Sequence, residues 1–209
     1  MVVDADAMSR VVDILSSLEF NETGRYLAAG DNGGRVVLFQ QEETRHRQEG
    51  MMLVTEGTEQ PSNYRFFSEF QSHEAEFDYL NSTEIQERIN CIQWLPSNPN
   101  CLFLLSANGR RGGGFQSVDK TIKLWKVSER HTGLIPCPLL DKKSSNPPES
   151  SIGIVAQNKR VYGHAHSFNI NSLSCFSDGE VFLSSDDLRI NLWNLEVSNQ
   201  SFSPSCCLA

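Results

Sequence analysis

The sequence lacks the features that mark membrane proteins and nucleic-acid-binding proteins. No stretch approaches the roughly 18 apolar residues of a membrane-spanning helix. The start, MVVDADAMSR, has no basic region followed by an apolar run, so no secretory signal is expected. Lysine is absent from the first 90 residues, where 17 acidic residues stand against seven arginines. Because phosphate contacts require clustered Lys and Arg, we do not expect nucleic acid as a partner. Without an apolar stretch of spanning length, we do not expect a membrane as a partner either.

Signatures of the common enzyme classes are absent too. The sequence holds no Gly-x-Ser-x-Gly, His-Glu-x-x-His or Walker pattern. The glycine-rich run at 109–118, GRRGGGFQSV, lacks the Gly-Lys-Ser/Thr ending and the following helix of a phosphate loop, which favours a flexible insertion. His164 and His166 are predicted to share one face of a strand without Cys or carboxylate partners at ligand spacing, so a structural role is favoured over metal binding. His73 is expected to be a hydrogen-bonded loop residue. We expect no catalytic activity, cofactor or metal.

The six cysteines fit a reducing compartment. Without a secretory signal, free thiols in the cytoplasm or also in the nucleus are the expected state. Cys91 and Cys175 fall inside predicted strands and are expected to be small core residues. The ending Cys206-Cys207-Leu208-Ala209 formally fits a prenylation box. No polybasic segment precedes it and one lipid anchors weakly, which favours an unmodified tail.

A triplet of short β-segments is clearest between Ile170 and Glu196. Ser-Asp-Gly at 177–179 is typical of a turn, since Asp bonds its own backbone and Gly accepts a positive φ. A short apolar segment follows, and Asp186-Asp187 turns the chain into the alternating strand Arg189 to Leu195. A triplet that ends in Leu-Trp is typical of a blade of a WD-repeat propeller.

The same frame occurs at Leu15–Phe39 and at Ile89–Trp125. Its closing strands are RVVLF, TIKLW and RINLW, each preceded by a polar turn. Chance alternation, which any all-β protein shows, is the other explanation, but three matches in the same order favour a repeat. The predicted fold is therefore all-β, a partial WD-repeat propeller with three blades. Because a propeller typically needs about four to eight blades, we expect a fragment whose ring lacks blades or is completed by another chain.

The pattern divides the chain into predicted parts. Residues 40–61 are expected to form a flexible loop, and Asn81 to Glu87 a short helical turn. The full division is a lead-in at 1–13, a partial propeller at 14–202 with blade one at 14–40, blade two at 64–127, a projecting loop or arm at 128–160 and blade three at 161–197, and a divergent tail at 203–209.

Several stretches are more specific than the repeat itself. FQSHEAEFDYL (70–80), INCIQWLP (89–96), DKTIKLWKVSER (119–130) and SSDDLRINLWNLEVSNQSF (184–202) closely resemble the B-type, fifty-five-kilodalton WD-repeat regulatory subunits of protein phosphatase type 2A, as does GDNGGRVVLFQ (30–40). The resemblance implies a seven-bladed ring, truncated here, and a non-enzymatic subunit. It would bind the helical-repeat scaffold subunit that carries the catalytic subunit, and would recruit phosphoprotein substrates through their basic segments.

The resemblance also implies two sets of binding residues. An acidic groove for substrates maps to Phe77, Asp78, Tyr79, Glu84, Glu87, Arg88, Asp186 and Asp187. A hairpin arm that contacts the scaffold would leave and return at Ser128, Glu129, Arg130, Lys159 and Arg160. The middle of this arm is short and divergent, and the insertion at 109–118 also departs from the family pattern.

The residues themselves allow alternatives to this groove. Carboxylates beside exposed aromatic rings suit Lys- and Arg-rich peptides, because the charge steers the peptide and the ring holds its side chains. The acidic residues could equally form a solvated face, Asp186-Asp187 a purely structural turn, and Phe77 and Tyr79 part of the core. The alternative functions are a generic WD-repeat interaction scaffold, or a remnant that forms no complex.

Overall fold

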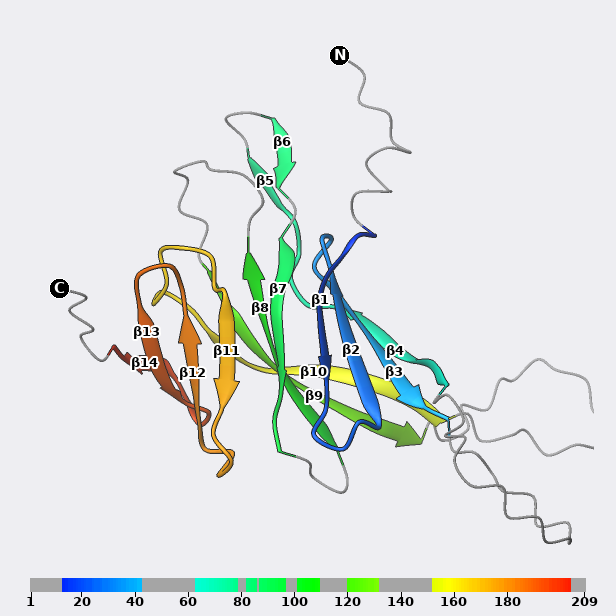
Figure 1. Ribbon diagram of the computed structural model, residues 1–209. Helices are drawn as coiled ribbons and strands as arrows, with labels where there is room; N and C mark the ends of the chain where they lie inside the picture. Colours follow the sequence, from blue (N-terminus) through cyan, green and yellow to red (C-terminus); the bar gives the residue numbers. More distant parts are fainter. Residues whose placement is uncertain are drawn as a thin grey trace, which may run out of the picture.

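The structure, a computed structural model, describes residues 13–42, 63–78, 82–85, 87–96, 101–109, 120–131 and 152–203. In this part of the chain every regular element is a β-strand, and three four-stranded antiparallel sheets stand side by side (Figure 1). No described helix is long and apolar enough to cross a membrane. The predicted fold class, an all-β partial WD-repeat propeller, is confirmed.

Each sheet contains one of the predicted strand triplets and a fourth, outer strand. Blade one comprises β1 (Leu15–Phe20), β2 (Tyr26–Asp31), β3 (Arg35–Gln41) and β4 (Tyr64–Gln71). Blade two comprises β7 (Arg88–Trp94), β8 (Leu102–Gly109), β9 (Ile122–His131) and β10 (Ile152–Tyr162). Blade three comprises β11 (Ser172–Cys175), β12 (Val181–Ser185), β13 (Ile190–Asn194) and β14 (Val197–Phe202).

The blade boundaries differ from the predicted ones because of the outer strands. Strand β4 lies in the range predicted for blade two, but it pairs with β3 and completes blade one. Strand β10 lies in the predicted arm, but it pairs with β9 along ten positions of blade two. Both boundaries were wrong because an outer strand is separated from its sheet by a long loop and shows little apolar alternation.

The segment around residues 76–85 also differs from its prediction. It forms a two-stranded hairpin, β5 (Glu76–Asp78) and β6 (Thr83–Ile85), which projects beyond the end of blade two in Figure 1. The predicted helical turn over Asn81 to Glu87 is therefore wrong at its centre. Backbone pairing across the hairpin outweighed the local capping preference of Ser82 and Thr83.

Polar turns join the inner strands as the sequence predicts. In the β2–β3 turn, Asp31 Oδ1 accepts hydrogen bonds from the backbone N–H groups of Gly33 and Arg35, each at 2.9 Å. Gly34 has φ +80°, and a Cβ on it would lie 2.1 Å from the carbonyl oxygen of His73. Glycine is therefore required at position 34 both by its backbone angle and by the close approach of the segment after β4.

Neighbouring blades pack through equivalent rows of apolar side chains. Each row joins cross-strand partners on the second and third strands of a blade, which share one face of the sheet. We call the face turned toward the next blade in the sequence the front face, and the opposite one the rear face. The front rows are Ala28–Leu38, Leu105–Leu124 and Leu183–Leu192, and the rear rows are Leu27–Phe39, Leu104–Trp125 and Phe182–Trp193.

Two hydrophobic clusters fill the spaces between the blades. The first combines the front row of blade one with the rear row of blade two, and the second combines the front row of blade two with the rear row of blade three. All eight of these side chains are at most 8% exposed. Full burial of each large apolar side chain contributes about 2 kcal/mol to the stability of the fold, so these contacts stabilise the packing of the three sheets in this order.

Hydrogen bonds cross both blade boundaries as well. Trp94 Nε1 donates to the carbonyl oxygen of Glu19 at 2.9 Å, which ties blade two to blade one. Tyr162 Oη donates to the carbonyl oxygen of Leu195 at 2.7 Å, which ties blade two to blade three. Each bond satisfies a polar tip on an otherwise apolar ring.

Candidate functional site

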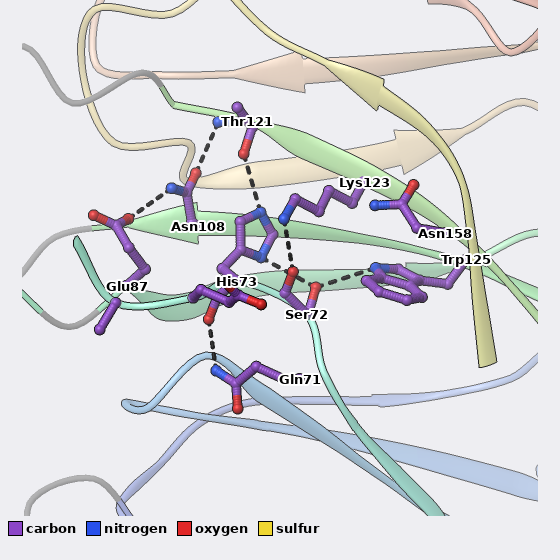
Figure 2. Close-up of a pocket in the computed structure, with 11 residues that line it drawn as sticks. Gln71, Ser72, His73, Glu87, Asn108, Thr121, Lys123, Trp125 and Asn158 are labelled. Carbon is purple, nitrogen blue, oxygen red and sulfur yellow. Dashed lines mark hydrogen bonds between the residues drawn. The ribbon is translucent and has the colours of Figure 1, made fainter. Parts of the chain in front are cut away.

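A polar pocket lies where the segment after β4 crosses the end of blade two (Figure 2). Its volume is about 540 Å³, and its lining includes His73, Glu74, Glu87 and Lys123. Lys123 Nζ donates to the carbonyl oxygen of Ser72 at 2.8 Å. The expected hydrogen-bonded loop histidine is confirmed, since His73 is buried and its Nε2 lies 3.1 Å from Thr121 Oγ1.

Charged groups of opposite sign line this pocket and affect each other's pKa. Burial lowers the pKa of Lys123, while the carboxylates of Glu74 and Glu87 act in the opposite direction. Burial, together with the positive charge of Lys123, lowers the pKa of His73 to about 3, so this imidazole is neutral near pH 7. The pocket therefore holds one ammonium group between carboxylates and a neutral ring.

Glu87 belongs to this pocket rather than to an open acidic surface. It is 2% exposed, and its Oε2 accepts a hydrogen bond from Asn108 Nδ2 at 2.6 Å. Because it is buried, the Glu87 side chain stabilises the end of blade two. Glu87 could contact a bound peptide directly only if its side chain became accessible.

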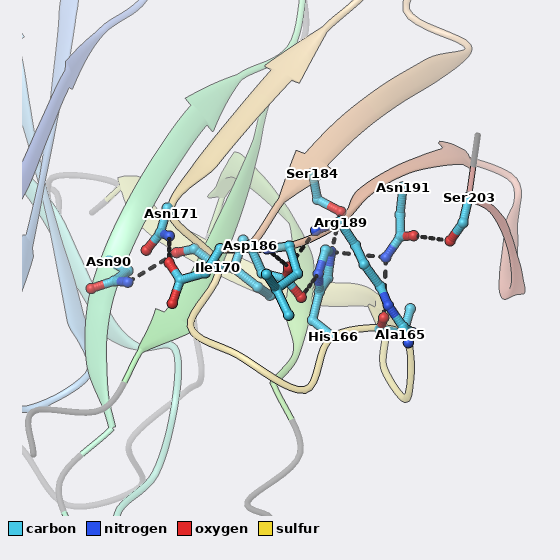
Figure 3. Close-up of polar contacts among 12 residues, drawn as sticks. Asn90, Ala165, His166, Ile170, Asn171, Ser184, Asp186, Arg189, Asn191 and Ser203 are labelled. Atoms are coloured by element: carbon cyan, nitrogen blue, oxygen red, sulfur yellow. Dashed lines mark hydrogen bonds and ion pairs between the residues drawn. The ribbon is translucent and has the colours of Figure 1, made fainter. Parts of the chain in front are cut away.

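The next residue, Arg88, is linked to blade three. Its Nε donates to Asn90 Oδ1 at 2.7 Å, and Asn90 Nδ2 donates across the blade boundary to the carbonyl oxygen of Ile170 at 2.9 Å. Asn171 Nδ2 then donates to Asp187 Oδ1 at 2.6 Å. Through these bonds, partly visible in Figure 3, two predicted groove residues on different blades are held in one connected arrangement.

Asp186 and Asp187 have different environments although they are adjacent. The Asp187 residue is exposed, whereas the Asp186 side chain is 1% exposed. Asp186 Oδ2 lies 2.9 Å from His166 Nδ1, and its Oδ1 accepts the backbone N–H groups of Leu188 and Arg189 (Figure 3). Burial alone would raise the pKa of Asp186, but its hydrogen bonds, led by that from His166, lower it. Asp186 therefore shapes the turn that presents Asp187.

His166 extends this turn into the interior of blade three. Its Nε2 lies 2.6 Å from Ser184 Oγ, which in turn accepts a hydrogen bond from Trp193 Nε1 at 2.7 Å. The predicted strand placement of His164 and His166 is wrong, since both lie in the connection between β10 and β11 and His164 has φ +61°. His166 serves a structural role, joining that connection to the β12–β13 turn.

Three of the remaining predicted groove residues, Phe77, Asp78 and Glu84, lie on the β5–β6 hairpin. Phe77 is 52% exposed, and the structure does not place it in the core. Its backbone partner across the hairpin is Glu84, while Asp78 pairs with Thr83. Tyr79 lies outside the described residues. The hairpin thus brings three of the predicted positions together at one end of blade two.

The predicted scaffold-binding residues divide into two groups along the β9–β10 hairpin. Ser128, Glu129 and Arg130 pair with Val155, Ile154 and Gly153. Arg160 pairs with Leu124, four positions back along β9, and forms an ion pair with Glu196 of the β13–β14 turn. Four strand positions correspond to about 13 Å, so the two groups do not form one compact patch. Glu129 and Lys159 are exposed.

Sequence reasoning missed the amides that connect the site. Asn90 and Asn171 each follow an isoleucine at the opening strand of a blade, in Ile89-Asn90 and Ile170-Asn171. This repeated dipeptide was the available signal. Within the described ranges, no group of three or more His, Cys, Asp or Glu side chains is arranged to hold a metal ion.

The strand arrangement, the repeated rows and the turn chemistry define this chain as part of a WD-repeat propeller. The model of the WD domain, G-beta repeat, matches residues 157–194, which cover most of blade three.

Comparison with curated proteins identifies a particular group within this class. The chain is 45% identical over 206 residues to a Candida tropicalis protein named as a regulatory B subunit of protein phosphatase PP2A, covering 91% of this chain and 36% of that protein. It is 42% identical to the beta isoform of the 55 kDa regulatory B subunit of serine/threonine protein phosphatase 2A from Arabidopsis thaliana, covering 92% of this chain and 44% of that protein. The corresponding beta isoform from Sus scrofa is 44% identical, with 91% and 42% covered.

The resemblance found in the sequence is therefore confirmed. The chain is homologous to part of these regulatory B subunits, and it spans less than half the length of the relatives described above.

Proposed function

We propose that this chain is a non-catalytic regulatory and targeting subunit of protein phosphatase 2A, or the corresponding part of one. It would associate with the scaffold and catalytic subunits and recruit phosphoprotein substrates through basic segments. The names of its relatives, at 42–45% identity over about nine-tenths of the chain, support the regulatory role.

The observation that carries the substrate part of the proposal is the exposed Asp187 carboxylate. It is oriented by Asn171 at the end of blade three, while Arg88 and Asn90 extend the hydrogen-bonded arrangement to blade two. The exposed ring of Phe77 stands on the hairpin beyond that blade. A carboxylate held in place attracts a Lys or Arg side chain, and an aromatic ring contacts its stem or its guanidinium group.

The test of this groove is binding of basic, phosphorylated peptides to the Asp187→Lys variant. Reversal of one exposed charge is expected to weaken binding about three- to tenfold at low salt, with a smaller effect at high salt. The matched control is Asp178→Lys, because Asp178 is another exposed carboxylate in a turn of blade three, where it accepts the backbone N–H of Glu180 at 3.0 Å. Equal effects of the two variants would refute a local role of Asp187.

The scaffold part of the proposal assigns contacts to the exposed residues of the β9–β10 hairpin. Lys159→Glu should reduce retention of the chain by the immobilised scaffold subunit. Arg65→Glu is the matched control, since Lys159 and Arg65 both lie on outer strands and each donates to a glutamine Oε1 at 3.1 Å. If both variants are retained like the unmodified chain, Lys159 is not part of the scaffold contact.

A generic WD-repeat interaction scaffold is the second candidate, supported by the repeat match alone. Such a protein would bind neither the phosphatase scaffold nor the catalytic subunit. Retention by the purified phosphatase subunits therefore separates the two candidates.

A further inference from the structure

Arg88, at the start of β7, carries a positive charge that no described carboxylate neutralises. Arg35 and Arg160 each form an ion pair with a carboxylate, but none of the ion pairs among the described residues contains Arg88. Its Nε donates instead to the neutral amide oxygen of Asn90 at 2.7 Å, and the residue is only partly buried. The charge of Arg88 is therefore available to a bound group.

Carboxylates are abundant in this chain, and two of the predicted groove carboxylates are hydrogen-bonded by amides. Acidic residues outnumber Lys and Arg by 26 to 18. Glu87 accepts from the Asn108 amide, and Asp187 accepts from the Asn171 amide. Arg88 thus has a neutral partner in an acidic protein, which favours a role toward a ligand over a role in balancing the charge of a neighbouring side chain.

The bond to Asn90 fixes how the guanidinium group of Arg88 is presented. Asn90 is itself held, because its Nδ2 donates to the carbonyl oxygen of Ile170 at 2.9 Å. On β8, Gly109 leaves the room that the Asn90 amide occupies, since a Cβ at position 109 would lie 2.4 Å from that amide. A guanidinium group bound at Nε keeps its two Nη groups for another partner, and this fork matches two oxygens of a carboxylate or phosphate.

The same hydrogen-bonded arrangement ends in a group of opposite charge. Ile170 is followed by Asn171, whose Nδ2 donates to the exposed Asp187 carboxylate at 2.6 Å (Figure 3). Standard bond lengths limit the path from the Arg88 guanidinium group to this carboxylate to about 20 Å. Because an extended peptide rises about 3.3 Å per residue, a segment of up to about six residues can reach both charged groups.

We propose that Arg88 is a specificity-determining residue that binds an oxyanion of the same substrate segment whose basic side chain is held by Asp187. This inference rests on the proposed function, because it adds an anion subsite to the proposed substrate-binding site. The oxyanion is the carboxylate of an Asp or Glu side chain or the phosphate of a phosphorylated residue, since both present two oxygens to a guanidinium fork. The preferred segments therefore carry charges of both signs within about six residues.

The test compares peptides that share one basic block and differ at a single position, placed about two to five residues from it. That position holds Ser, Glu or phosphoserine, and dissociation constants for the 209-residue chain are measured by fluorescence anisotropy. At low salt, an acidic peptide is expected to bind about three- to tenfold more tightly than the Ser peptide, as a charge-assisted contact at a partly exposed site should. The Glu and phosphoserine peptides distinguish a carboxylate from a phosphate as the preferred group. This comparison needs no variant of the chain.

The Arg88→Gln variant should lose the preference, so that the three peptides bind it within about twofold of one another. Arg88→Lys keeps the charge without the fork, so only part of the preference is expected to remain. The matched control is Arg65→Gln, which should keep the full preference. Arg65 also donates to a neutral amide oxygen, that of Gln40, but it lies on blade one outside the arrangement that leads to Asp187. Circular dichroism verifies the strand content of each variant.

Three results would overturn the inference. Equal binding of the three peptides to the unmodified chain at every spacing would mean that Arg88 provides no anion subsite; if Asp187→Lys still weakens their binding, the proposed function stands without it. A preference that Arg88→Gln retains in full would place the anion subsite on another residue. If none of the peptides binds the chain, the proposed recruitment of substrates fails, and the inference fails with it.

Discussion

The network behind the β12–β13 turn gives the sharpest prediction about stability. Ser184 is 1% exposed, and its hydroxyl connects Trp193 to His166. His166 Nδ1 donates to the Asp186 carboxylate. Asn191 Nδ2, which can only donate, lies 3.1 Å from His166 Nε2, so Nε2 acts as an acceptor and also accepts from the Ser184 hydroxyl. The Ser184 hydroxyl oxygen then accepts a hydrogen bond from the Trp193 indole N–H. The hydrogen bonds therefore run in one direction, from Trp193 through Ser184 and His166 to Asp186.

The Ser184→Ala variant removes two of these bonds without changing the shape of the site. Each bond is worth about 1 kcal/mol, and the buried Trp193 Nε1–H left behind costs about 1–3 kcal/mol more. The expected loss in the free energy of unfolding is therefore about 3–5 kcal/mol. For a chain of this size that lowers the midpoint of thermal unfolding by roughly 6–20 °C.

The measurement is reversible urea or thermal unfolding followed by circular dichroism. Ser174→Ala is the matched control, because Ser174 lies on β11 of the same sheet and is exposed. Its expected change is within about 0.5 kcal/mol. If Ser184→Ala also stays within that margin of the unmodified chain, the network does not stabilise blade three.

Three other predictions concern single residues. The unfolded chain protonates His73 below about pH 6.5, whereas the folded chain does so only near its pKa of about 3, so the free energy of unfolding should fall as the pH drops from 7 to 5. His73→Gln should remove roughly 1 kcal/mol per pH unit of that fall. Equal pH dependence of the free energy of unfolding in urea for the variant and the unmodified chain would contradict this. Gly34→Ala should cost more than about 2 kcal/mol beyond Gly24→Ala, since both residues have positive φ but a Cβ at Gly24 meets nothing within 4 Å; equal midpoints would refute the clash. Burial raises the pKa of the Cys91 and Cys175 thiols to about 12 each, so mass spectrometry after brief alkylation of the native chain at pH 8 should find both unmodified, and rapid labelling would contradict this.

The inner strands and their turns could be predicted because their signals are local. The closing strands end in Phe39, Trp125 and Trp193, and register places all three in equivalent rear rows. The Asp186 turn was visible for the same reason, since an Asx side chain bonds the backbone two or three residues on. The outer strands could not be assigned, because β4, β10 and β14 depend on pairing partners rather than on their own pattern.

The candidate site was predictable in its residue types but not in its burial. Glu87 and Asp187 look alike in a sequence, yet the first is 2% exposed beside Asn108 and the second is exposed beside Asn171. Likewise, nothing local shows that Asp186 is held by His166, 20 residues earlier. Such distinctions depend on how the connections between blades pack on the next sheet, and this packing is set by the fold as a whole.

The proposed role of this chain as a regulatory subunit of protein phosphatase 2A can be tested by assembling the complex from its parts. Purified scaffold and catalytic subunits of protein phosphatase 2A are mixed with the chain and separated by size-exclusion chromatography with light scattering. One species that contains all three polypeptides is expected, and Lys159→Glu should reduce its amount. Co-elution of the scaffold and catalytic subunits without the chain, under conditions where the chain itself is folded, would contradict the claim.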